Sequence, residues 1–422
     1  MSGRRYDIVV FGATGFTGQR VVTELVSAGA RESWNIAVAG RDALKLEKLV
    51  AERGNGAPLE VIVADVRRPE SLLAMAKSTR LVLACVGPYR YHGEPVVQAC
   101  VEAGTDYLDI SGEPEFIETM EYKYQDAAQA AGCYIASAAG FDSVPADMGT
   151  LYVARKFTPP AVPHSVDSYL TVHARNGLRA HYPTWESLVM GMAHANELRA
   201  LRKRALAEGK AAKQPKLTGP KPERATGAAY NDTVGAFAVP FPGADASVVK
   251  RTQAALAARG QPAVHYAAYM TVPSRWVLFL IGFFGAILQK LANSSFGRAL
   301  LLTYPGLFSY GVFTKKGPSE KELQGTSFTM TYVAKGYSQG APTDTAQKPD
   351  RQIVARMVGP ELGYVATPIF LVQAAFALLS ERDRLQLPGG VYTVGALLGG
   401  TNYLERLQKS GIQLTDISDK RV

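Results

Sequence analysis

Short apolar runs alternate with longer amphipathic stretches through the first 145 residues of the chain. Six runs have the length and composition of buried strands, at residues 6–11, 34–40, 59–64, 81–86, 107–111 and 134–139. The stretches between them have helical character, as in the one that carries Leu44, Leu46 and Leu49. Strands and helices in alternation predict an α/β fold, a doubly wound parallel sheet of the Rossmann type.

The pattern changes beyond residue 147. Segments rich in β-formers occur at 167–174, 265–272 and 328–334, and long irregular stretches separate them. This texture predicts a second, α+β domain over residues 148–360, after a first domain over residues 1–147. Residues 363–381 have the composition of a long apolar helix, so we expect the last segment, 361–422, to return and pack on the first domain.

Two apolar tracts, 276–289 and 300–313, lie inside the second predicted domain and together span 276–313. The first has no charged residue, and as a helix it would extend about 21 Å, less than the roughly 30 Å hydrocarbon core of a bilayer. Basic residues flank the tracts: Arg275, Lys290, Arg298, Lys315 and Lys316. Aromatic side chains with basic flanks favour insertion into one leaflet, or into a lipid-droplet monolayer, over a simple transmembrane helix. A buried core helix or a homodimer interface is the alternative.

The first apolar run leads directly into the glycine-spaced turn GATGFTG at residues 12–18. Gly12 would let the chain turn sharply, Gly15 would let the backbone approach a pyrophosphate, and Gly18 would let helix and strand pack closely. The phosphates would then lie on free N–H groups at the positive end of a helix dipole. The spacing G-x-x-G-x-x-G is a variant of the commoner G-x-G-x-x-G, and a purely structural tight turn is the alternative.

The end of the second predicted strand bears on which nicotinamide cofactor is bound. An acidic residue there binds the ribose 2′-hydroxyl of NAD, whereas an arginine can pair with the 2′-phosphate of NADP. The chain has Arg41 followed by Asp42, and Asp42 is well placed as the N-cap of the next helix. We therefore assign the phosphate to Arg41 and expect NADP(H) to be favoured over NAD(H).

Further cofactor contacts are expected at the carboxyl ends of the other strands, where ligands of doubly wound sheets lie. Asp65 is placed to touch the adenine edge, and the loop at residues 87–95 would form a wall of the nicotinamide end. The predicted cofactor-binding residues are Gly12, Thr14, Gly15, Phe16, Gly18, Arg41, Asp65, Gly87 and Pro88. No metal site is expected, because Cys85, Cys100 and Cys133 lack metal-ligand spacing.

Hydride transfer often needs a side chain that supplies a proton near the nicotinamide. Side chains at the expected mouth that could do so are Tyr89, Tyr91, His92, Glu113, Asp142, Ser143, His181 and Tyr182. His92 is a catalytic candidate because an imidazole titrates near neutrality, and Tyr89 and Tyr182 are two more. A surface histidine, core tyrosines and a turn cap at Asp142 are the alternatives, and such roles are the commoner ones.

The net charge of +9 comes mostly from residues 199–224, where nine basic and two acidic residues leave +7. We interpret this run first as a solvated, mobile loop and second as a contact for an anionic membrane surface. Nucleic acid is not expected, because no aromatic side chains for base stacking are interleaved. The first apolar run is a strand rather than a secretory signal, so we expect a location on the cytoplasmic side of a membrane or lipid droplet.

Six motifs also resemble a known family. They are YDIVVFGATGFTGQ, VAGRDALKL, CVGPYRYHGEPVVQAC, YLDISGEP, GFDSVPADMG and GYVATPI, and they are spread over nearly the whole chain. Together they resemble the saccharopine dehydrogenase-like oxidoreductases of eukaryotes, which are similar to bacterial trans-acting enoyl reductases. The resemblance implies a Rossmann domain, a mixed second domain and an association with lipid droplets or other membranes. It matches Gly12, Gly15 and Gly18 to the phosphate loop and Arg41 to the basic residue at the second strand end.

Two functions remain open. Saccharopine carries several carboxylates, and a pocket for it needs converging basic side chains. The second predicted domain instead offers apolar and aromatic stretches, which suit a lipophilic substrate. The first function is therefore an NADP(H)-dependent oxidoreductase acting on a lipid at a membrane or lipid-droplet surface. The alternative is a membrane-associated protein that binds the nucleotide and catalyses nothing.

Overall fold

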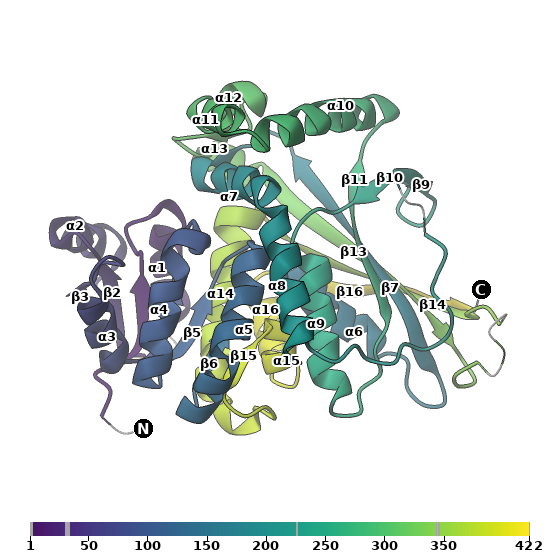
Figure 1. The fold of residues 1–422 in the computed structure, drawn as a ribbon, viewed down its shortest axis with the longest axis horizontal. Helices are drawn as coiled ribbons and strands as arrows, with labels where there is room; N and C mark the ends of the chain where they lie inside the picture. The colour runs from purple at the N-terminus through teal and green to yellow at the C-terminus, as the bar shows by residue number, and fades with distance from the viewer. Residues whose placement is uncertain (1–2, 30–33, 225–226, 343, 345–346, 422) are drawn as a thin grey trace. The chain divides into compact units, whose positions relative to one another are not determined.

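The computed structural model describes residues 3–29, 34–224, 227–342, 344 and 347–421, which form two compact units (Figure 1). Unit 1 consists of three chain segments, Met1–Asp142, Asn196–Lys210 and Gly363–Leu407. Unit 2 consists of Ser143–Ala195, Ala211–Leu362 and Gln408–Val422. The chain therefore leaves unit 1 and returns to it twice. The segment 361–422, expected to return as a whole, is divided: Gly363–Leu407 belongs to unit 1 and Gln408–Val422 to unit 2.

Unit 1 contains a seven-stranded sheet in the order β15-β6-β5-β4-β1-β2-β3, with all neighbours parallel. Its strands are β1 (Tyr6–Phe11), β2 (Ile36–Gly40), β3 (Glu60–Val63), β4 (Thr79–Ala84), β5 (Asp106–Asp109), β6 (Tyr134–Ala136) and β15 (Gly390–Tyr392). The six strands predicted from the sequence are present, which confirms the α/β class. The order reverses between β1 and β4, so the switch point where such sheets bind ligands lies at the carboxyl ends of these two strands.

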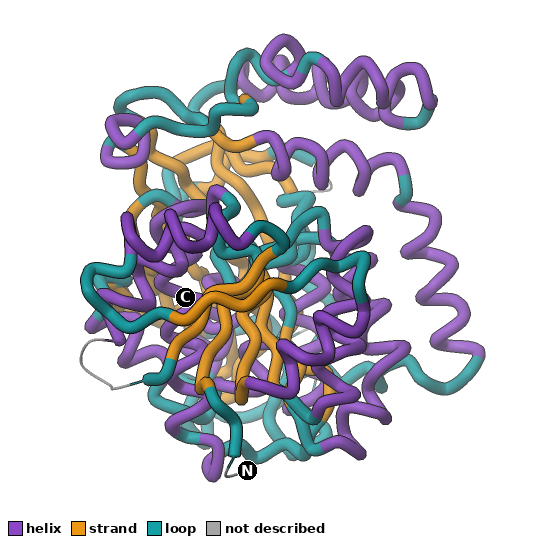
Figure 2. The backbone as a smooth tube through the Cα atoms, turned by 90° about the vertical axis from the view of Figure 1, so that its left-hand side faces the viewer, coloured by secondary structure: helices purple, strands orange, loops and turns teal. Residues whose placement is uncertain are grey.

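Helices lie on both faces of this sheet (Figure 2). They are α1 (Phe16–Gly29), α2 (Ala43–Arg53), α3 (Pro69–Ser78), α4 (Tyr89–Ala103), α5 (Pro114–Ala131), α14 (Thr367–Ser380), α15 (Val394–Leu398) and α16 (Tyr403–Lys409), with a 3₁₀ turn at Arg382–Arg384. Helix α4 contacts α3 and α5, and α1 contacts α2 and α14. Helix α14 follows a π-helical turn at Leu362–Ala366 and is buried from Thr367 to Leu379. Its Phe376 stacks on Trp34 at 5.9 Å between ring centroids, so a segment from late in the chain helps to build the core of unit 1.

Unit 2 contains a second seven-stranded sheet, in the order β16-β14-β13-β7-β11-β10-β9. Its strands are β7 (Val162–Ala174), β9 (Ala229–Asn231), β10 (Ala236–Pro240), β11 (His265–Val272), β13 (Thr326–Tyr337), β14 (Arg351–Pro360) and β16 (Gln413–Arg421). Among the residues that the structure describes, the β7–β11 pair is the only parallel pair of this sheet. Helices α6 (Val144–Ala154) and α9 (Asp245–Ala257) contact each other and the sheet. The three strands predicted in this region are present, and the α+β class is confirmed.

The two apolar tracts fold into neighbouring helices of unit 2, which we call the apolar cluster. It comprises α10 (Arg275–Ala292), α11 (Ser295–Thr303) and α12 (Pro305–Phe308). The cluster packs on α7 (Tyr182–Ala193) beside the two-stranded sheet of β8 (Ala180–His181) and β12 (Phe313–Thr314), and α13 (Glu320–Gln324) follows. Its small core is made by Trp185, Val189, Ala292 and Leu301, and the Trp185 Nε1 donates to the Leu301 carbonyl at 2.9 Å.

Two helices among the described residues are long and apolar enough to cross a membrane, Arg275–Ala292 and Leu362–Ser380. Of the second, 83 % is buried, so it is a core element of unit 1. Of the first, only 6 % is buried, and the alternative of a buried core helix is therefore wrong for α10. The 18 residues of α10 extend about 27 Å, still short of the roughly 30 Å hydrocarbon core.

The basic run at residues 199–224 makes ion pairs near both of its ends. Its first part lies in helix α8 (Ala195–Ala207), which has no buried residue. Arg202 pairs with Glu118 of α5 at 2.6 Å, and Glu197 pairs with Arg90 of α4 at 2.7 Å. At the far end of the run, Arg224 pairs with Asp167 of β7 at 2.7 Å. The expectation of a mobile loop is wrong for α8, because its charges find partners on helices that are distant in the sequence.

Candidate functional site

The glycine turn lies at the switch point of the first sheet, where β1 ends. Gly12 has φ +81°, a conformation that only glycine adopts without strain, and a Cβ there would lie 2.5 Å from Val86 Cγ2. A Cβ at Gly18 would lie 2.2 Å from the Gly12 carbonyl oxygen, so helix α1 approaches the strand end as closely as the backbone allows. Both positions match the roles predicted for them.

Gly15 differs from the other two glycines because it faces outward. It is exposed, and the nearest atom to a Cβ built there is the Gly12 carbonyl oxygen at 3.2 Å. The turn delivers the chain into α1, whose first amides have no carbonyl partner within the helix. Phe16 in this turn contacts Tyr364 edge-on at 4.9 Å between ring centroids. The outward side of the turn therefore offers N–H donors and a helix dipole to an anion.

Arg41 and Asp42 follow β2, the strand next to β1. Asp42 accepts a hydrogen bond from Lys45 N at 3.2 Å and caps α2, as predicted. One oxygen of its carboxylate, Oδ1, is thus engaged in the helix start. Arg41 is exposed and makes no ion pair with a described residue. The strand end therefore presents a positive charge.

Asp65 follows β3, at the edge of the sheet beyond β2. Its Oδ1 accepts from Arg67 N at 2.9 Å and from Arg67 Nε at 3.2 Å, and its Oδ2 accepts from Arg67 Nη2 at 2.8 Å. The hydrogen bonds from Arg67 lower the pKa of Asp65 to about 2, and the charge of Arg41 contributes a little. Both carboxylate oxygens are therefore occupied by one arginine, which the sequence did not suggest.

The segment at residues 87–95 is mostly helix rather than the predicted loop. Helix α4 begins at Tyr89, and the two carboxylate oxygens of Glu113 accept from Tyr89 N at 2.9 Å and Arg90 N at 3.1 Å. Glu113 thus satisfies the first amides of α4 from the segment after β5. The predicted wall is wrong as a loop, but Gly87 remains exposed just before the helix, and Pro88 is its N-cap.

The three catalytic candidates lie in different environments. The Tyr89 hydroxyl donates to the Ala84 carbonyl at the end of β4, at 2.7 Å. Burial raises the pKa of Tyr89 well above its ordinary value, so the phenol stays protonated. His92 lies in the first turn of α4, partly exposed, with its ring against Tyr91. Tyr182 begins α7 in unit 2, where the Lys315 ammonium lies 6.0 Å from its ring centre. Their catalytic roles remain predictions.

Asp109, at the end of β5, was not among the predicted site residues. It is fully buried and accepts from Ser111 N at 2.9 Å, Ala138 N at 3.0 Å and Ser137 Oγ at 2.9 Å. Burial raises its pKa to about 6, although these hydrogen bonds oppose the shift. Ala138 has φ +59°, and the Asp109 bond holds it there. Asp109 thus fixes the backbone after β5 and β6, and the signal for it was an acid ending an apolar strand.

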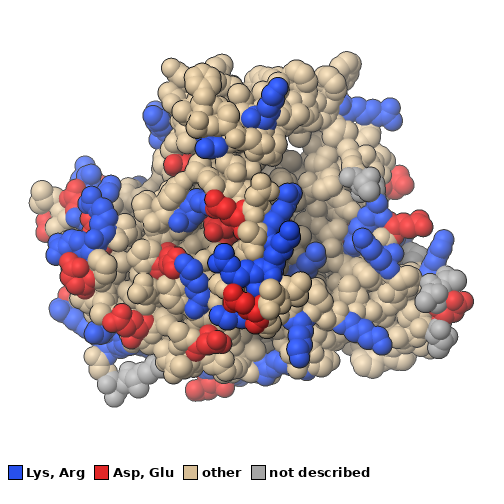
Figure 3. Space-filling view, in the orientation of Figure 1, with Lys and Arg blue, Asp and Glu red and all other residues tan. Residues whose placement is uncertain are grey.

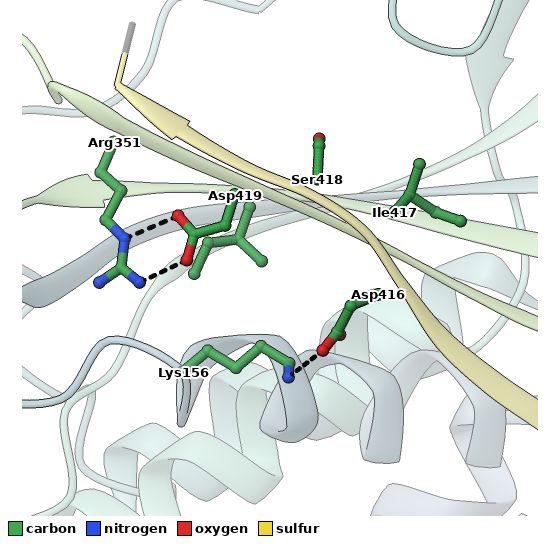
Figure 4. Close-up of a pocket in the computed structure, with 7 residues that line it drawn as sticks. Lys156, Arg351, Asp416, Ile417, Ser418 and Asp419 are labelled. Atoms are coloured by element: carbon green, nitrogen blue, oxygen red, sulfur yellow. Dashed lines mark hydrogen bonds and ion pairs between the residues drawn. The ribbon is translucent and has the colours of Figure 1, made fainter.

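An open cavity of about 360 Å³ lies apart from these residues, along β14 and β16 of unit 2 (Figure 4). Lys156 pairs with Asp416 at 2.6 Å, and Arg351 makes two hydrogen bonds to Asp419, at 2.9 and 2.6 Å. Lys156 also lies 4.3 Å from the ring centre of Tyr152. These charges neutralise one another. We therefore interpret the cavity as a gap lined by ion pairs of the edge strand β16 rather than as a ligand site.

A glycine turn at the switch point of a parallel sheet is typical of a dinucleotide-binding Rossmann domain. In agreement, residues 8–135 match the family model described as the saccharopine dehydrogenase NADP binding domain. The chain is 40 % identical to the human "Saccharopine dehydrogenase-like oxidoreductase", and the match covers 99 % of each chain. The protein therefore belongs to the saccharopine dehydrogenase-like oxidoreductase family, as its motifs indicated.

Two further relatives carry names that bear on location. A Caenorhabditis elegans relative, 35 % identical over 97 % of each chain, is the "Lipid droplet localized protein". An Arabidopsis thaliana relative, 38 % identical over 98 % of this chain and 96 % of its own, is a "probable mitochondrial" saccharopine dehydrogenase-like oxidoreductase. Members of the family are thus assigned to different organelles.

A solved structure shares the fold at much lower identity. Saccharopine dehydrogenase (L-Glu forming) from Saccharomyces cerevisiae has a TM-score of 0.52 and 13 % identity, over 98 % of this chain and 100 % of that chain. At this identity the likeness extends to the architecture and not to the substrate.

Proposed function

We propose that this protein is an NADP(H)-dependent oxidoreductase that acts on a lipophilic substrate while attached to a membrane or lipid-droplet surface. The observation that carries the proposal is the pairing, in one chain, of an open phosphate turn with an exposed apolar cluster. Nicotinamide cofactors supply hydride chemistry, and the protein then has to bind the cofactor, orient it and bring in the substrate.

The preference for NADP(H) rests on the strand end beside the glycine turn. Arg41 is exposed there, and the neighbouring Asp42 carboxylate is engaged in capping α2. A 2′-phosphate would gain a charged partner at Arg41, whereas the neighbouring acid, Asp42, already uses Oδ1 to cap α2. Cofactor contacts are proposed for Gly12, Thr14, Gly15, Phe16 and Gly18, with Arg41, Gly87 and Pro88 completing the set.

The membrane part of the proposal rests on the apolar cluster. Its exposed large apolar side chains are Trp276, Phe279, Leu280, Ile281, Phe283, Ile287, Phe296 and Leu307, and the exposed Tyr304 and Tyr310 flank α12. From Arg275 to Lys316 the chain has no acidic residue but keeps the flanking basic ones. In Figure 3 this part of the surface is mainly tan with isolated blue side chains, whereas blue and red intermix elsewhere. An apolar surface with basic flanks suits an anionic lipid surface better than a second copy carrying the same charge.

A lipid-dependent turnover assay tests the catalytic part. Purified protein is supplied with NADPH and a panel of unsaturated and keto lipids in vesicles, and nucleotide oxidation is followed by absorbance. Oxidation that requires one lipid of the panel supports the proposal. An Arg41→Ala variant should bind NADPH more weakly by about 1.5–3 kcal/mol and NADH nearly as before, since a charged hydrogen bond is lost. An equal loss for both nucleotides would contradict the assignment.

Vesicle flotation tests the membrane part. The double variant Phe279→Glu/Phe283→Glu should stay with the soluble fraction, whereas wild type floats with vesicles that contain anionic lipid. Leu44→Glu is the matched control, because Leu44 is 77 % exposed on α2, outside the apolar cluster. Wild type that never floats, but forms a dimer which the double variant loses, would assign the cluster to a second copy.

A nucleotide-binding protein without catalysis is the second candidate. It is favoured by Tyr89, whose buried phenol donates to the Ala84 carbonyl at the end of β4. Tight NADPH binding without turnover across the whole lipid panel would support this function and contradict the first.

A further inference from the structure

Arg67 is held in place more firmly than an ordinary surface arginine. Its guanidinium donates through Nε and Nη2 to the two oxygens of Asp65, and its own backbone N–H donates to the same carboxylate. Asp65 N in turn donates to Ser71 Oγ at 3.1 Å, which anchors the carboxylate at the start of α3. The side chain of Arg67 is nevertheless 77 % exposed.

Stability accounts for only part of this arrangement. Asp65 is 14 % exposed but the Arg67 side chain is 77 % exposed, so solvent partly screens the pair and ordering the arginine costs entropy. The arrangement does fix the plane of the guanidinium. A planar group that is already oriented loses little further freedom when an aromatic ring stacks on it.

The pair lies at the carboxyl end of the sheet, on the side of the proposed site that would hold the adenosine. Asp65 lies beyond β3, next to the end of β2 that carries Arg41, and the charge of Arg41 acts on Asp65. We infer that Arg67 is the platform on which the adenine of the nucleotide stacks, and that Asp65 acts by positioning Arg67 rather than by touching the adenine. This inference rests on the proposed function, because it deepens the assignment of the same nucleotide site.

Stacking fits Arg67 better than a second phosphate contact does. Asp65 neutralises the Arg67 charge and occupies its Nε–Nη2 edge, which leaves the flat face available. Arg41 makes no such pair with a described residue and keeps its charge for the phosphate. The two arginines therefore divide the adenosine end: Arg41 discriminates NADP from NAD, whereas Arg67 serves both.

Nucleotide titrations of four variants test the inference. Arg67→Ala should raise the Kd of NADPH and of NADH alike, by about five-fold, as expected for a lost cation–π contact at an exposed site. Arg67→Lys should also lose affinity, though less, because an ammonium can lie over the ring but has no plane to stack on it. Asp65→Asn should weaken both nucleotides by a smaller factor. Arg68→Ala is the matched control: Arg68 is one residue further on, is exposed and pairs with Glu70 at 3.0 Å, and its removal should leave both Kd values unchanged.

The outcomes separate the inference from the proposed function. A loss confined to NADPH would make Arg67 a phosphate ligand and overturn the platform, and so would full affinity in Arg67→Ala or in Arg67→Lys. Wild type that binds neither nucleotide would overturn the proposed function itself. Circular dichroism and the melting temperature of each variant, measured without nucleotide, should match those of wild type.

Discussion

Helices α10 and α14 have similar apolar composition but opposite surroundings. Each lies in a segment long and apolar enough to cross a membrane, yet 83 % of the α14 segment is buried and only 6 % of α10. Helix α14 contacts α1, α15 and the strands β4 and β5, whereas α10 contacts mainly α7 and α11 along one side. Hydropathy alone therefore does not tell which apolar helix belongs to the core.

The distribution of side-chain sizes separates the two helices. In α14, the alanines at 374, 375 and 377 are fully buried and let the helix approach its neighbours closely. Helix α10 instead carries Trp276, Phe279 and Phe283 outward, and its glycines at 282 and 285 face open space. Small residues among aliphatic ones indicate a packed helix, and aromatic residues beside unpacked glycines indicate one that meets lipid or a partner.

Matched phenylalanine truncations give the largest contrast between the helices. Phe370→Ala in α14 should lower the free energy of unfolding by about 3–5 kcal/mol, because the ring is fully buried and leaves a cavity. Phe279→Ala in α10 should change it by less than about 0.5 kcal/mol, since the ring is 61 % exposed. Urea denaturation of both variants measures the difference. Comparable losses would mean that α10 is packed as tightly as α14.

A pH titration extends the comparison to the core around α14, which contacts β5. The pKa of Asp109 at the end of β5 is about 6 in the folded protein, above its unfolded value of 3.8, so the native state holds this proton more tightly. The contribution of Asp109 to the free energy of unfolding is therefore highest below pH 4, where Asp109 is protonated in both states. This contribution falls by up to about 3 kcal/mol as the pH rises to 6, because the unfolded state then loses the proton more readily. In Asp109→Asn this fall should be absent. Urea midpoints of both proteins at several pH values measure it, and parallel curves would show that Asp109 does not titrate there.

Tryptophan fluorescence examines the α10 side of the comparison. Trp276 is 78 % exposed, whereas Trp185 is buried, so lipid should act mainly on Trp276. Adding anionic vesicles should shift the emission to shorter wavelength, and Trp276→Phe should abolish the shift while leaving flotation within about three-fold of wild type. A shift that persists in Trp276→Phe would place the lipid contact elsewhere.

The smallest expected effect is a change in NADPH affinity when a residue just before α14 is truncated. Tyr364, just before α14, meets Phe16 of the glycine turn edge-on. Tyr364→Ala should weaken NADPH by about 1 kcal/mol, because an aromatic pair that supports the turn is lost. Phe279→Ala in α10 should leave NADPH affinity unchanged. Calorimetric titration compares the two variants, and an equal change in both would remove the distinction.

The features that were predicted correctly are those that depend on a few adjacent residues. The six strands, the glycine turn and the Asp42 cap each depend on a few adjacent residues, and all were predicted. Features built by distant partners were not. Glu113 caps α4 from 24 residues away, and α8 is held by partners such as Glu118, 84 residues before Arg202. The fixed Arg67 and the buried Asp109 were likewise missed, because their environments depend on side chains and strand ends brought together by folding.

The division of unit 1 into three segments has a consequence for biosynthesis. A domain at the N-terminus usually folds while the ribosome is still translating the rest. Here the first sheet waits for β15 at Gly390–Tyr392, and the second waits for β16 at Gln413–Arg421. A premature stop codon ahead of β15 deprives both sheets of an edge strand and exposes unpaired backbone. A chain truncated ahead of β15 should therefore fail to complete either sheet.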